Sequence, residues 1–466
     1  MRRASSALVP VGHRFRVSIL VAGTVILGVA TPSSAVHLHS VSTDPYRNTT
    51  SFHRTEVEPD TFSYGSTIVA AFQAGRFDTG GASNVGWATS SNGGRSWAHG
   101  FLPSTTVYAK PAGSYLRVSD PSVAYDAKHQ QWLIATVALD APEHVPAVLV
   151  SRSPDGRHWG DPIAIATTTT GNLDKDWIAC DNTASSPFFG NCYAQWDDAA
   201  TGDTLHLAYS SDGGQTWNAS TAPSTVVIGG QPLVQPTGTV IVPILSGPDI
   251  VSFVSNDGGV SFTGPYTVAA AESAGFPSLR SGPLPSAEID AAGTVYVVWQ
   301  DCSFEPSCTA DDIVMSTSVD GVAWTPSVRI PIDPVGSGVG HFIPGLGVDR
   351  TTSGSTARLA LAYYYHSPES TCGELTCGLN VGFVSSLDGG ANWASPIQLA
   401  GPMSLLALPL TNQGFMVGDY ISTSFVDGRA FPVFAVTTKK TPCTLGAKSS
   451  CNAKMVVPVG GLPVGQ

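Results

Sequence analysis

The sequence predicts an all-β fold built from a repeated four-stranded sheet. Two observations predict it: a short turn motif that occurs six times, and a pair of β-prone runs around a turn that occurs seven times. A repeat of this kind sets the architecture before any single residue is considered. Four-stranded sheets repeated around an axis form a β-propeller, which is the fold class we expect.

The turn motif reads Ser-x-Asp-Gly-(Gly)-x-x-Trp, with Phe in place of Trp once. Its Asp can accept hydrogen bonds from the following backbone N–H groups, and its Gly supplies the positive φ that the turn needs. We therefore expect each copy to be a hairpin turn rather than a catalytic group. The copies span residues 90–97, 153–159, 210–217, 255–262, 318–324 and 386–393; the second and fifth lack one Gly, and Asn92 replaces Asp in the first.

The paired β-prone runs predict the other two strands of each sheet. They span residues 57–72, 120–137, 176–196, 232–244, 287–299, 342–364 and 419–434. No turn motif follows the last pair, so we expect strands near 455–459 and 36–41 to complete its sheet and close the ring. The count favours seven blades, and six is the alternative if one pair is misassigned. We expect residues 36–466 to form a single propeller domain.

Residues 1–35 have the pattern of a signal peptide. Four arginines precede an apolar run over residues 17–30, and Ser33-Ser34-Ala35 offers a cleavage site. An uncleaved membrane anchor is the alternative, although the run is short for a span. These residues contain no acid, so the rest of the chain is more acidic than the formal net charge of −12. We expect a secreted, extracellular monomer that binds neither nucleic acid nor, after cleavage, membranes.

The eight cysteines fall into four pairs that are close in sequence. Connectivity cannot be deduced from sequence, but local pairing is the simplest expectation for an exported chain. Zinc binding is the alternative, although no Cys-x-x-Cys is present. The pairs are Cys180/Cys192, Cys302/Cys308, Cys372/Cys377 and Cys443/Cys451.

The six turn motifs resemble the Asp box of sialidases and their relatives, and the resemblance covers nearly the whole chain after residue 35. It implies a glycoside hydrolase that acts on extracellular glycans, with a carbohydrate or glycoconjugate as its partner. Residues 71–78 look like the sialidase segment that carries the acid, which makes Asp78 the candidate proton donor. Residues 420–428 look like the segment that holds the nucleophile, which makes Tyr420 the candidate, with Glu288 as its partner.

Ionisable residues recur at the starts of the paired runs, where the loops of a propeller converge on its axial funnel. A carboxylate-bearing substrate needs guanidinium groups, and Arg54 stands where sialidases carry the first arginine of a triad. The two other triad positions hold Trp299-Gln300-Asp301 and Cys377-Gly378-Leu379-Asn380 instead, so Arg117 or Arg280 would have to substitute. The expected substrate-binding residues are Arg54, Arg76, Arg117, Asp120, Lys175 and Asp419.

Two other functions are compatible with these residues. The missing arginines favour a non-catalytic propeller that binds glycans or proteins through its funnel. A calcium-supported lyase or hydrolase is also possible, with Asp174, Asp176 and Asp181 as oxygen ligands. We expect no other cofactor and no other metal site, because the histidines lack metal-ligand spacing.

Overall fold

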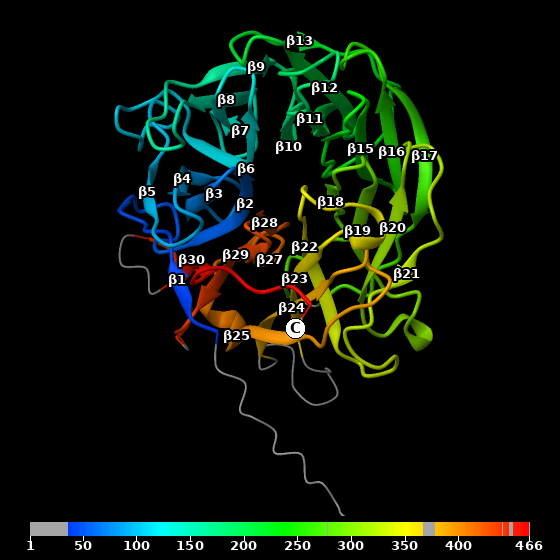
Figure 1. Ribbon diagram of the computed structural model, residues 1–466. Coiled ribbons are helices and arrows are strands. Elements are labelled where there is room, and N and C mark those ends of the chain that lie inside the picture. Colours follow the sequence, from blue (N-terminus) through cyan, green and yellow to red (C-terminus); the bar gives the residue numbers. More distant parts are fainter. Residues whose placement is uncertain (1–35, 277, 367–377, 440, 447–450, 466) are drawn as a thin grey trace, which may run out of the picture. The chain divides into compact units, whose positions relative to one another are not determined.

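The structure is a computed structural model that describes residues 36–466, except residues 277, 367–377, 440, 447–450 and 466 (Figure 1). The expected signal peptide, residues 1–35, lies outside the described residues, as does the pair Cys372/Cys377. Within the described part, the chain forms strands and short 3₁₀ turns and contains no α-helix, which confirms the all-β prediction.

Most strands fall into groups of four that follow one another along the chain, each an antiparallel meander. Their bounds are β2–β5 (Glu56–Tyr64, Thr67–Arg76, Ala82–Ser90, Ala98–Phe101), β6–β9 (Arg117–Asp126, Gln131–Leu139, Ala147–Ser153, Ile163–Thr167), β10–β13 (Leu173–Cys180, Cys192–Asp198, Thr204–Ser210, Asn218–Ala219), β14–β17 (Leu233–Val234, Val240–Ser246, Asp249–Ser255, Thr263–Ala270), β18–β21 (Ser286–Ile289, Val295–Asp301, Asp312–Ser318, Val328–Arg329) and β22–β25 (Gly340–Val348, Leu359–His366, Leu379–Ser386, Ile397–Met403). A single residue pair, Ala82 with Val118, joins the first two groups into one sheet.

The last group is assembled from both ends of the chain. Strands β28 (Ser422–Val426), β29 (Arg429–Thr437) and β30 (Ala453–Pro458) pair in that order, and β1 (Leu38–Ser40) pairs with β30 on the outside. This is the pairing that the sequence predicts for the last unit. The remaining elements are β26 (Leu410–Thr411), which pairs with β27 (Gly414–Phe415), and 3₁₀ turns at Ala199–Thr201, Pro306–Cys308, Gly354–Thr356 and Leu405–Ala407.

The first strands of the groups contact one another in chain order. β2 lies against β6, β6 against β10, β10 against β14, β14 against β18, β18 against β22, and β22 against β28. β28 lies against β2, so the circuit of contacts returns to its start (Figure 1). The predicted four-stranded antiparallel sheets are therefore confirmed, and their first strands line a common interior.

Apolar side chains on both faces of each sheet hold the neighbours together. On β3, Ile68, Ala70 and Phe72 pack into one cluster with β28 and β29, whereas Val69 and Ala71 pack into another with β6 and β7. Successive side chains of a strand point to opposite faces, so a strand that is buried on both faces reads as a continuous apolar run. This is why the second and third strands are so rich in Val, Ile and Ala.

The Asp boxes connect the third strand of a sheet to the fourth, as the sequence predicts. In the third box, Asp212 Oδ1 accepts hydrogen bonds from the backbone N of Gln215 and Thr216, each at 2.9 Å. The Ser210 hydroxyl donates to the same oxygen at 2.9 Å and accepts from the N of Gly214 at 3.0 Å. The Asp carboxylate of this box is therefore hydrogen-bonded within its own turn.

The Asp boxes also pack against the preceding sheet. The second Gly of the fourth box, Gly259, has a φ of +89°, and a Cβ there would lie 2.7 Å from the ring of Tyr193 on β11. The corresponding Gly94 faces Phe431 on β29 in the same way. Glycine is required here for its conformation and for the close approach of the neighbouring sheet.

Disulfides join Cys180 to Cys192, Cys302 to Cys308 and Cys443 to Cys451, which confirms local pairing for the three pairs that the structure describes. Each closes a short stretch of chain, and the first ties β10 to its partner β11. No helix among the described residues is long and apolar enough to cross a membrane.

Candidate functional site

Four first strands share one irregularity near their N-terminal ends. The pairing of β2, β6, β10 and β22 with the next strand shifts register between Val57 and Asp60, Ser119 and Ser122, Asp174 and Trp177, and Phe342 and Gly345. One non-glycine residue inside each shift has a left-handed φ: Glu58 (60°), Asp120 (48°), Lys175 (51°) and Ile343 (50°). Such bulges re-aim a side chain, and residues with this φ cluster at functional sites.

The charged side chains of three bulges meet. Lys175 Nζ lies 3.4 Å from Glu58 Oε1 and 3.9 Å from Asp120 Oδ1, and it also contacts Asp419 Oδ2. Arg280 Nε donates to Asp419 Oδ1 at 2.6 Å, and its Nη2 contacts Oδ2. We call Glu58, Asp120, Lys175, Arg280 and Asp419 the central cluster. All are buried except Arg280, whose side chain is 17% exposed.

Burial and the two cations divide the acids of the site into two classes. Burial opposes ionisation of Asp419, but Arg280 and Lys175 outweigh it and hold the pKa of Asp419 well below its ordinary value. Burial also opposes ionisation of Asp120, but Lys175 together with hydrogen bonds from Asp174 and Ser119 outweighs it and lowers the pKa of Asp120. Burial raises the pKa of Glu58 to about 8, and burial together with the Asp120 carboxylate raises the pKa of Asp174 to about 7. Near neutral pH, ionised and protonated carboxyl groups therefore stand side by side.

A cavity of about 210 Å³ opens beside the central cluster. It lies among residues at the starts of β6 and β10 and the ends of β3 and β7. Two arginines and three acids line it together: Arg76, Arg280, Asp120, Asp174 and Glu143. Neutral polar groups from Ser119, Thr79, Asn172, Asn412 and Gln413 also line it. We call this space the cluster cavity.

Arg76 lines the cluster cavity and has one donor without a hydrogen-bond partner. Its side chain is 2% exposed, and its Nη1 donates to Gln73 Oε1 at 2.9 Å. Its Nε is buried without a hydrogen-bond partner. Burial and the nearby Arg280 lower its pKa, but an arginine remains charged in a protein. A buried guanidinium with an open edge is a ready-made partner for a planar anion such as a carboxylate.

A second, larger cavity of about 850 Å³ lies toward the opposite ends of the first strands. Its lining begins two residues after members of the central cluster, with Asp60, Trp177 and Ile421, and it continues to the turns that follow the first strands. The central cluster therefore lies between the two cavities along β6 and β10.

The structure brings four of the predicted substrate-binding residues together. Asp120, Lys175 and Asp419 belong to the central cluster, and Arg76 lies at its cavity. Tyr420 is adjacent: it is 7% exposed, its hydroxyl donates to the carbonyl O of Pro121 at 3.2 Å, and its ring meets Trp177 edge-on. Burial raises the pKa of Tyr420 well above its ordinary value, and Glu58 adds to the shift.

Asp78 and Arg117 lie at the edge of this region. Arg117 Nη1 donates to Thr79 Oγ1 and to Gly80 O, each at 2.9 Å, and these two acceptors line the cluster cavity. The Arg117 guanidinium lies 4.1 Å from the centre of the Phe77 ring. Asp78 is the acid that acts electrostatically on Arg117. The backbone O of Asp78 accepts a hydrogen bond from the backbone N of Asn412. Arg117 is thus engaged in holding the 77–80 turn.

Arg54 and Glu288 lie apart from the central cluster. Arg54 is exposed, and its backbone N donates to Asp44 Oδ2 at 2.6 Å. Glu288, on β18, lines the larger cavity and pairs with Arg350 Nη2 at 2.9 Å. Among the described residues, Glu288 and Tyr420 share no hydrogen bond; the carboxylate with the largest effect on Tyr420 is Glu58.

Several residues of the site carry no signal in the sequence pattern. Gln73, on β3, contacts Glu58 Oε2 and donates to Ser119 Oγ at 3.0 Å, which links two bulges. Asp197, on β11, is buried with both carboxylate oxygens unpartnered, and burial raises its pKa to about 9. The one available signal was the repeated charged residue before Pro or Asp at the bulges, in Val57-Glu58-Pro59, Ser119-Asp120-Pro121 and Asp174-Lys175-Asp176.

The predicted calcium ligands do not converge on one point. Asp181 accepts hydrogen bonds from Ser186 Oγ and from Thr183 N and so caps a turn. Asp174 lines the cluster cavity, and Asp176 is buried with both oxygens unpartnered. Among the described residues, these three are not one of the groups whose ligand atoms could all reach a single ion.

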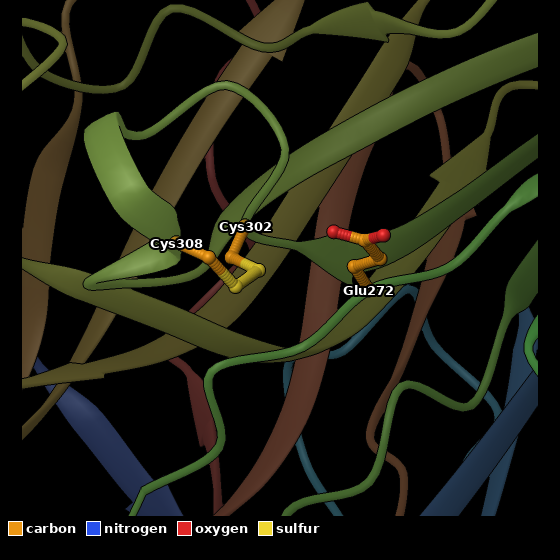
Figure 2. A group of neighbouring side chains, drawn as sticks. All are labelled: Glu272, Cys302 and Cys308. Carbon is orange, nitrogen blue, oxygen red and sulfur yellow. A yellow bond between two sulfur atoms is a disulfide. The ribbon is translucent and has the colours of Figure 1, made fainter.

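One group that could reach an ion is Glu272 with Cys302 and Cys308 (Figure 2). Figure 2 shows the two sulfur atoms bonded to each other. A metal needs the thiolate form of cysteine, so this disulfide removes both sulfur ligands and leaves Glu272 alone.

No protein-family model matches the chain, and no curated protein matches it. Sialidases are among the solved structures to which the protein is similar, as the Asp boxes led us to expect. The Trypanosoma rangeli sialidase in complex with sialic acid is 13% identical with a TM-score of 0.48, over 89% of this chain and 71% of that one. The phage phi92 endosialidase is 13% identical with a TM-score of 0.49, over 93% and 70%. The Hadza microbial sialidase Hz136 is 14% identical with a TM-score of 0.45, over 88% and 66%.

Proposed function

We propose that the seven four-stranded groups are the blades of one seven-bladed β-propeller. The support is the circuit of contacts that runs through β2, β6, β10, β14, β18, β22 and β28 and returns to β2. The seventh blade would be completed by β1, which joins the two ends of the chain. In a propeller, the N-terminal ends of the first strands converge on one face, and the central cluster stands at those ends.

We propose further that the protein is an exported glycoside hydrolase of sialidase type, whose substrate is a saccharide that carries a carboxylate. One observation carries this proposal: the open edge of the buried Arg76 guanidinium, at a cavity that Arg280 also lines. Two guanidinium groups beside one small cavity favour an anionic group in it, even though the chain as a whole is acidic. Disulfides in the described residues and the pattern of residues 1–35 support export.

Asp174 is the proposed proton donor. It lines the cavity, and a carboxyl group with a pKa of about 7 keeps its proton near neutral pH and can deliver it to the leaving glycosidic oxygen. Asp120, which stays ionised and accepts a hydrogen bond from Asp174, is the proposed group that holds the Asp174 proton in place. Water attacks the anomeric carbon as its bond to the leaving oxygen breaks, and the proton of that water passes to solvent. A neighbouring pair of acids with pKa values pushed apart is the usual basis for such a division of roles.

Tyr420 as nucleophile and Asp78 as acid form the competing assignment that the sialidase resemblance implies. Tyr420 would have to release the Pro121 carbonyl and transfer its proton to a base, for which Glu58 is better placed than Glu288. Asp78 would have to act from the turn that Arg117 holds. Variants at these positions distinguish the two assignments.

A binding protein without catalysis is the second candidate. The observation that favours it is the pairing within the central cluster, where Asp419 already occupies both Arg280 and Lys175. A substrate carboxylate would then find Arg76 as its main partner, which suits recognition more than the strong hold of an arginine triad.

The test is hydrolysis of fluorogenic sialosides and uronides by the full chain. We expect turnover that Asp174→Asn strongly lowers and a KM that Arg76→Gln raises, because the first change removes the proton and the second the carboxylate partner. Arg54→Gln is the control, because Arg54 is exposed and lies off the cavity. If no glycoside is turned over, but calorimetry shows acidic saccharides binding in a manner that Arg76→Gln weakens, the binding function holds. If neither turnover nor binding occurs, both candidates fail.

A further inference from the structure

A second buried polar group lies away from the cluster cavity, where β20 and β22 begin. Asp312 opens β20, His341 is the second residue of β22, and Asp333 lies in the loop after β21. One oxygen of each acid and one ring nitrogen of His341 all lie within 4.8 Å of one another. His341 Nδ1 is 4.0 Å from Asp312 Oδ1. The ligands that we predicted from the sequence include none of these residues.

The Nδ1 atom of His341 lacks a hydrogen-bond partner among the described residues. The His341 side chain is 2% exposed, and its Nδ1 is buried with no hydrogen-bond partner among the described residues. A nitrogen that is taken out of water without a partner is destabilising by itself. Tyr363 and Tyr365 pack on the ring and fix its position between them.

The charges around this nitrogen do not balance. Asp333 and Glu305 are neighbouring acids that act electrostatically on Asp312. Arg329 is the cation that contacts them, with its Nε 2.6 Å from Asp312 Oδ2 and its Nη2 2.6 Å from Asp333 Oδ1. Three carboxylates and one guanidinium leave two negative charges uncompensated.

We propose that Asp312, Asp333 and His341 form a binding site for a divalent transition-metal ion, with Zn²⁺ as the best fit. One imidazole nitrogen with two carboxylate oxygens is a donor set that zinc accepts, and a water molecule completes four ligands. Ligands of a tetrahedral zinc lie about 3.3 Å apart, so the group, whose ligand atoms lie within 4.8 Å of one another, has to contract when the ion binds. A charge of +2 balances the two uncompensated carboxylates.

The contacts around the ligands suit this role. Arg329 holds the far oxygen of Asp312 and one oxygen of Asp333, and the Ser337 hydroxyl contacts the other oxygen of Asp333. Carboxylates that bind zinc are commonly oriented by such outer contacts. The side chains of Asp333 and Arg329 are 18% and 10% exposed, which gives the ion a route from solvent. The site is separate from the cluster cavity, so its role is structural and independent of the proposed hydrolase activity.

The test is to remove bound metal from the full chain with a chelator and then to measure zinc binding by calorimetry. We expect one equivalent of Zn²⁺ to bind and to raise the thermal midpoint. Asp333→Asn and His341→Gln should each weaken the affinity at least about tenfold. Asp333 lies in a part-exposed loop, so its variant is expected to fold even if the His341 variant does not.

Glu272→Gln is the matched control, because Glu272 stands beside two sulfurs that a disulfide has removed as ligands (Figure 2). It should bind zinc as the unmodified chain does. Exposed pairs such as His158 with Asp155 can also attract zinc, and the variants separate that binding from the proposed site. Zinc binding that is absent from the unmodified chain, or that Asp333→Asn and His341→Gln leave unchanged, would overturn the proposal.

Discussion

Lys175 and Asp419 are 244 positions apart in the chain, yet the ammonium of one contacts the carboxylate of the other in the protein interior. Lys175 stands in the bulge of β10, and Asp419 lies three residues before the start of β28, which lies against β2. The contact therefore joins two distant sheets through a charge pair that is 5% and 7% exposed.

Replacing Lys175 by Met should destabilise the fold strongly. The change leaves Asp120 and Asp419 buried with one cation fewer, and breaking a buried ion pair from one side costs about 3–5 kcal/mol. We expect a loss of this size in the free energy of unfolding, measured by urea denaturation. Lys110→Met, at an exposed lysine, should change it by less than about 0.5 kcal/mol. Equal effects at the two positions would show that the central cluster contributes nothing to stability.

Tyr420→Phe and Asp174→Asn should separate the two assignments of catalytic groups. If Asp174 donates the proton, Asp174→Asn lowers kcat by about 10²–10⁴, the contribution usual for general acid catalysis. Tyr420→Phe loses a hydrogen bond to Pro121 O and should cost about 1 kcal/mol of stability with kcat changed by less than about tenfold. Steady-state kinetics with urea denaturation checks both. A large loss of kcat in Tyr420→Phe alone would instead favour the tyrosine nucleophile.

The pH dependence of stability should carry the signature of Asp174. Its pKa is raised from 3.8 to about 7 in the folded protein, so the folded state keeps a proton that the unfolded chain has released. The contribution of Asp174 to the free energy of unfolding then falls as the pH rises from about 4 to about 7, and this contribution is constant above that. Other raised acids contribute to the same fall, so Asp174→Asn should reduce its size without removing it. Urea titrations across this range provide the measurement.

Asp212→Asn is the control for that experiment, because the hydrogen bonds of the box outweigh burial and lower the pKa of Asp212. A lowered acid contributes stability that is lost only as the pH falls below its ordinary value. The variant should therefore leave the fall between pH 4 and pH 7 unchanged. An Asp174→Asn curve with the same fall as the unmodified chain would contradict the shift.

Gly259→Ala should be more damaging than Gly247→Ala. Both glycines have a positive φ, +89° and +58°, so alanine has a strained backbone conformation at both positions. Only Gly259 also faces a ring, because its Cβ would lie 2.7 Å from Tyr193, whereas nothing lies within 4 Å at Gly247. We expect an additional loss of about 1–3 kcal/mol at Gly259 from overpacking, visible as a lower Tm. Similar losses in the two variants would mean that the boxes do not seat neighbouring sheets.

The sequence predicts the sheets well because their signals are local. The hairpin turns, the Asp boxes and the alternation of buried residues are each written within about ten consecutive residues, and all appear in the structure at those places. Even the joining of β1 to β30 could be predicted, because the last unit lacked a fourth strand.

The site is predicted less completely because its contacts are not local. Asp120, Lys175 and Asp419 stand at the starts of paired runs, a position that predicts convergence, and they do converge. Arg280 reaches the cluster from a loop, and the sequence offers it only as a possible substitute for a missing triad arginine. Gln73 reaches the cluster from a second strand, and no pattern in the sequence marks it. Glu288 stands on a short strand without a bulge and lines the larger cavity instead, where it meets Arg350.

The pairing of β1 with β30 has a consequence for biosynthesis. The backbone N of Met455 donates a hydrogen bond to the Ser42 hydroxyl across 413 positions. The sheet that contains β1 therefore cannot form until β30 has been synthesised. A nascent chain that lacks its final residues holds an unpaired strand edge at its N-terminus, which is a site for misassociation. Truncation near residue 453 should therefore disturb the beginning of the protein as much as its end.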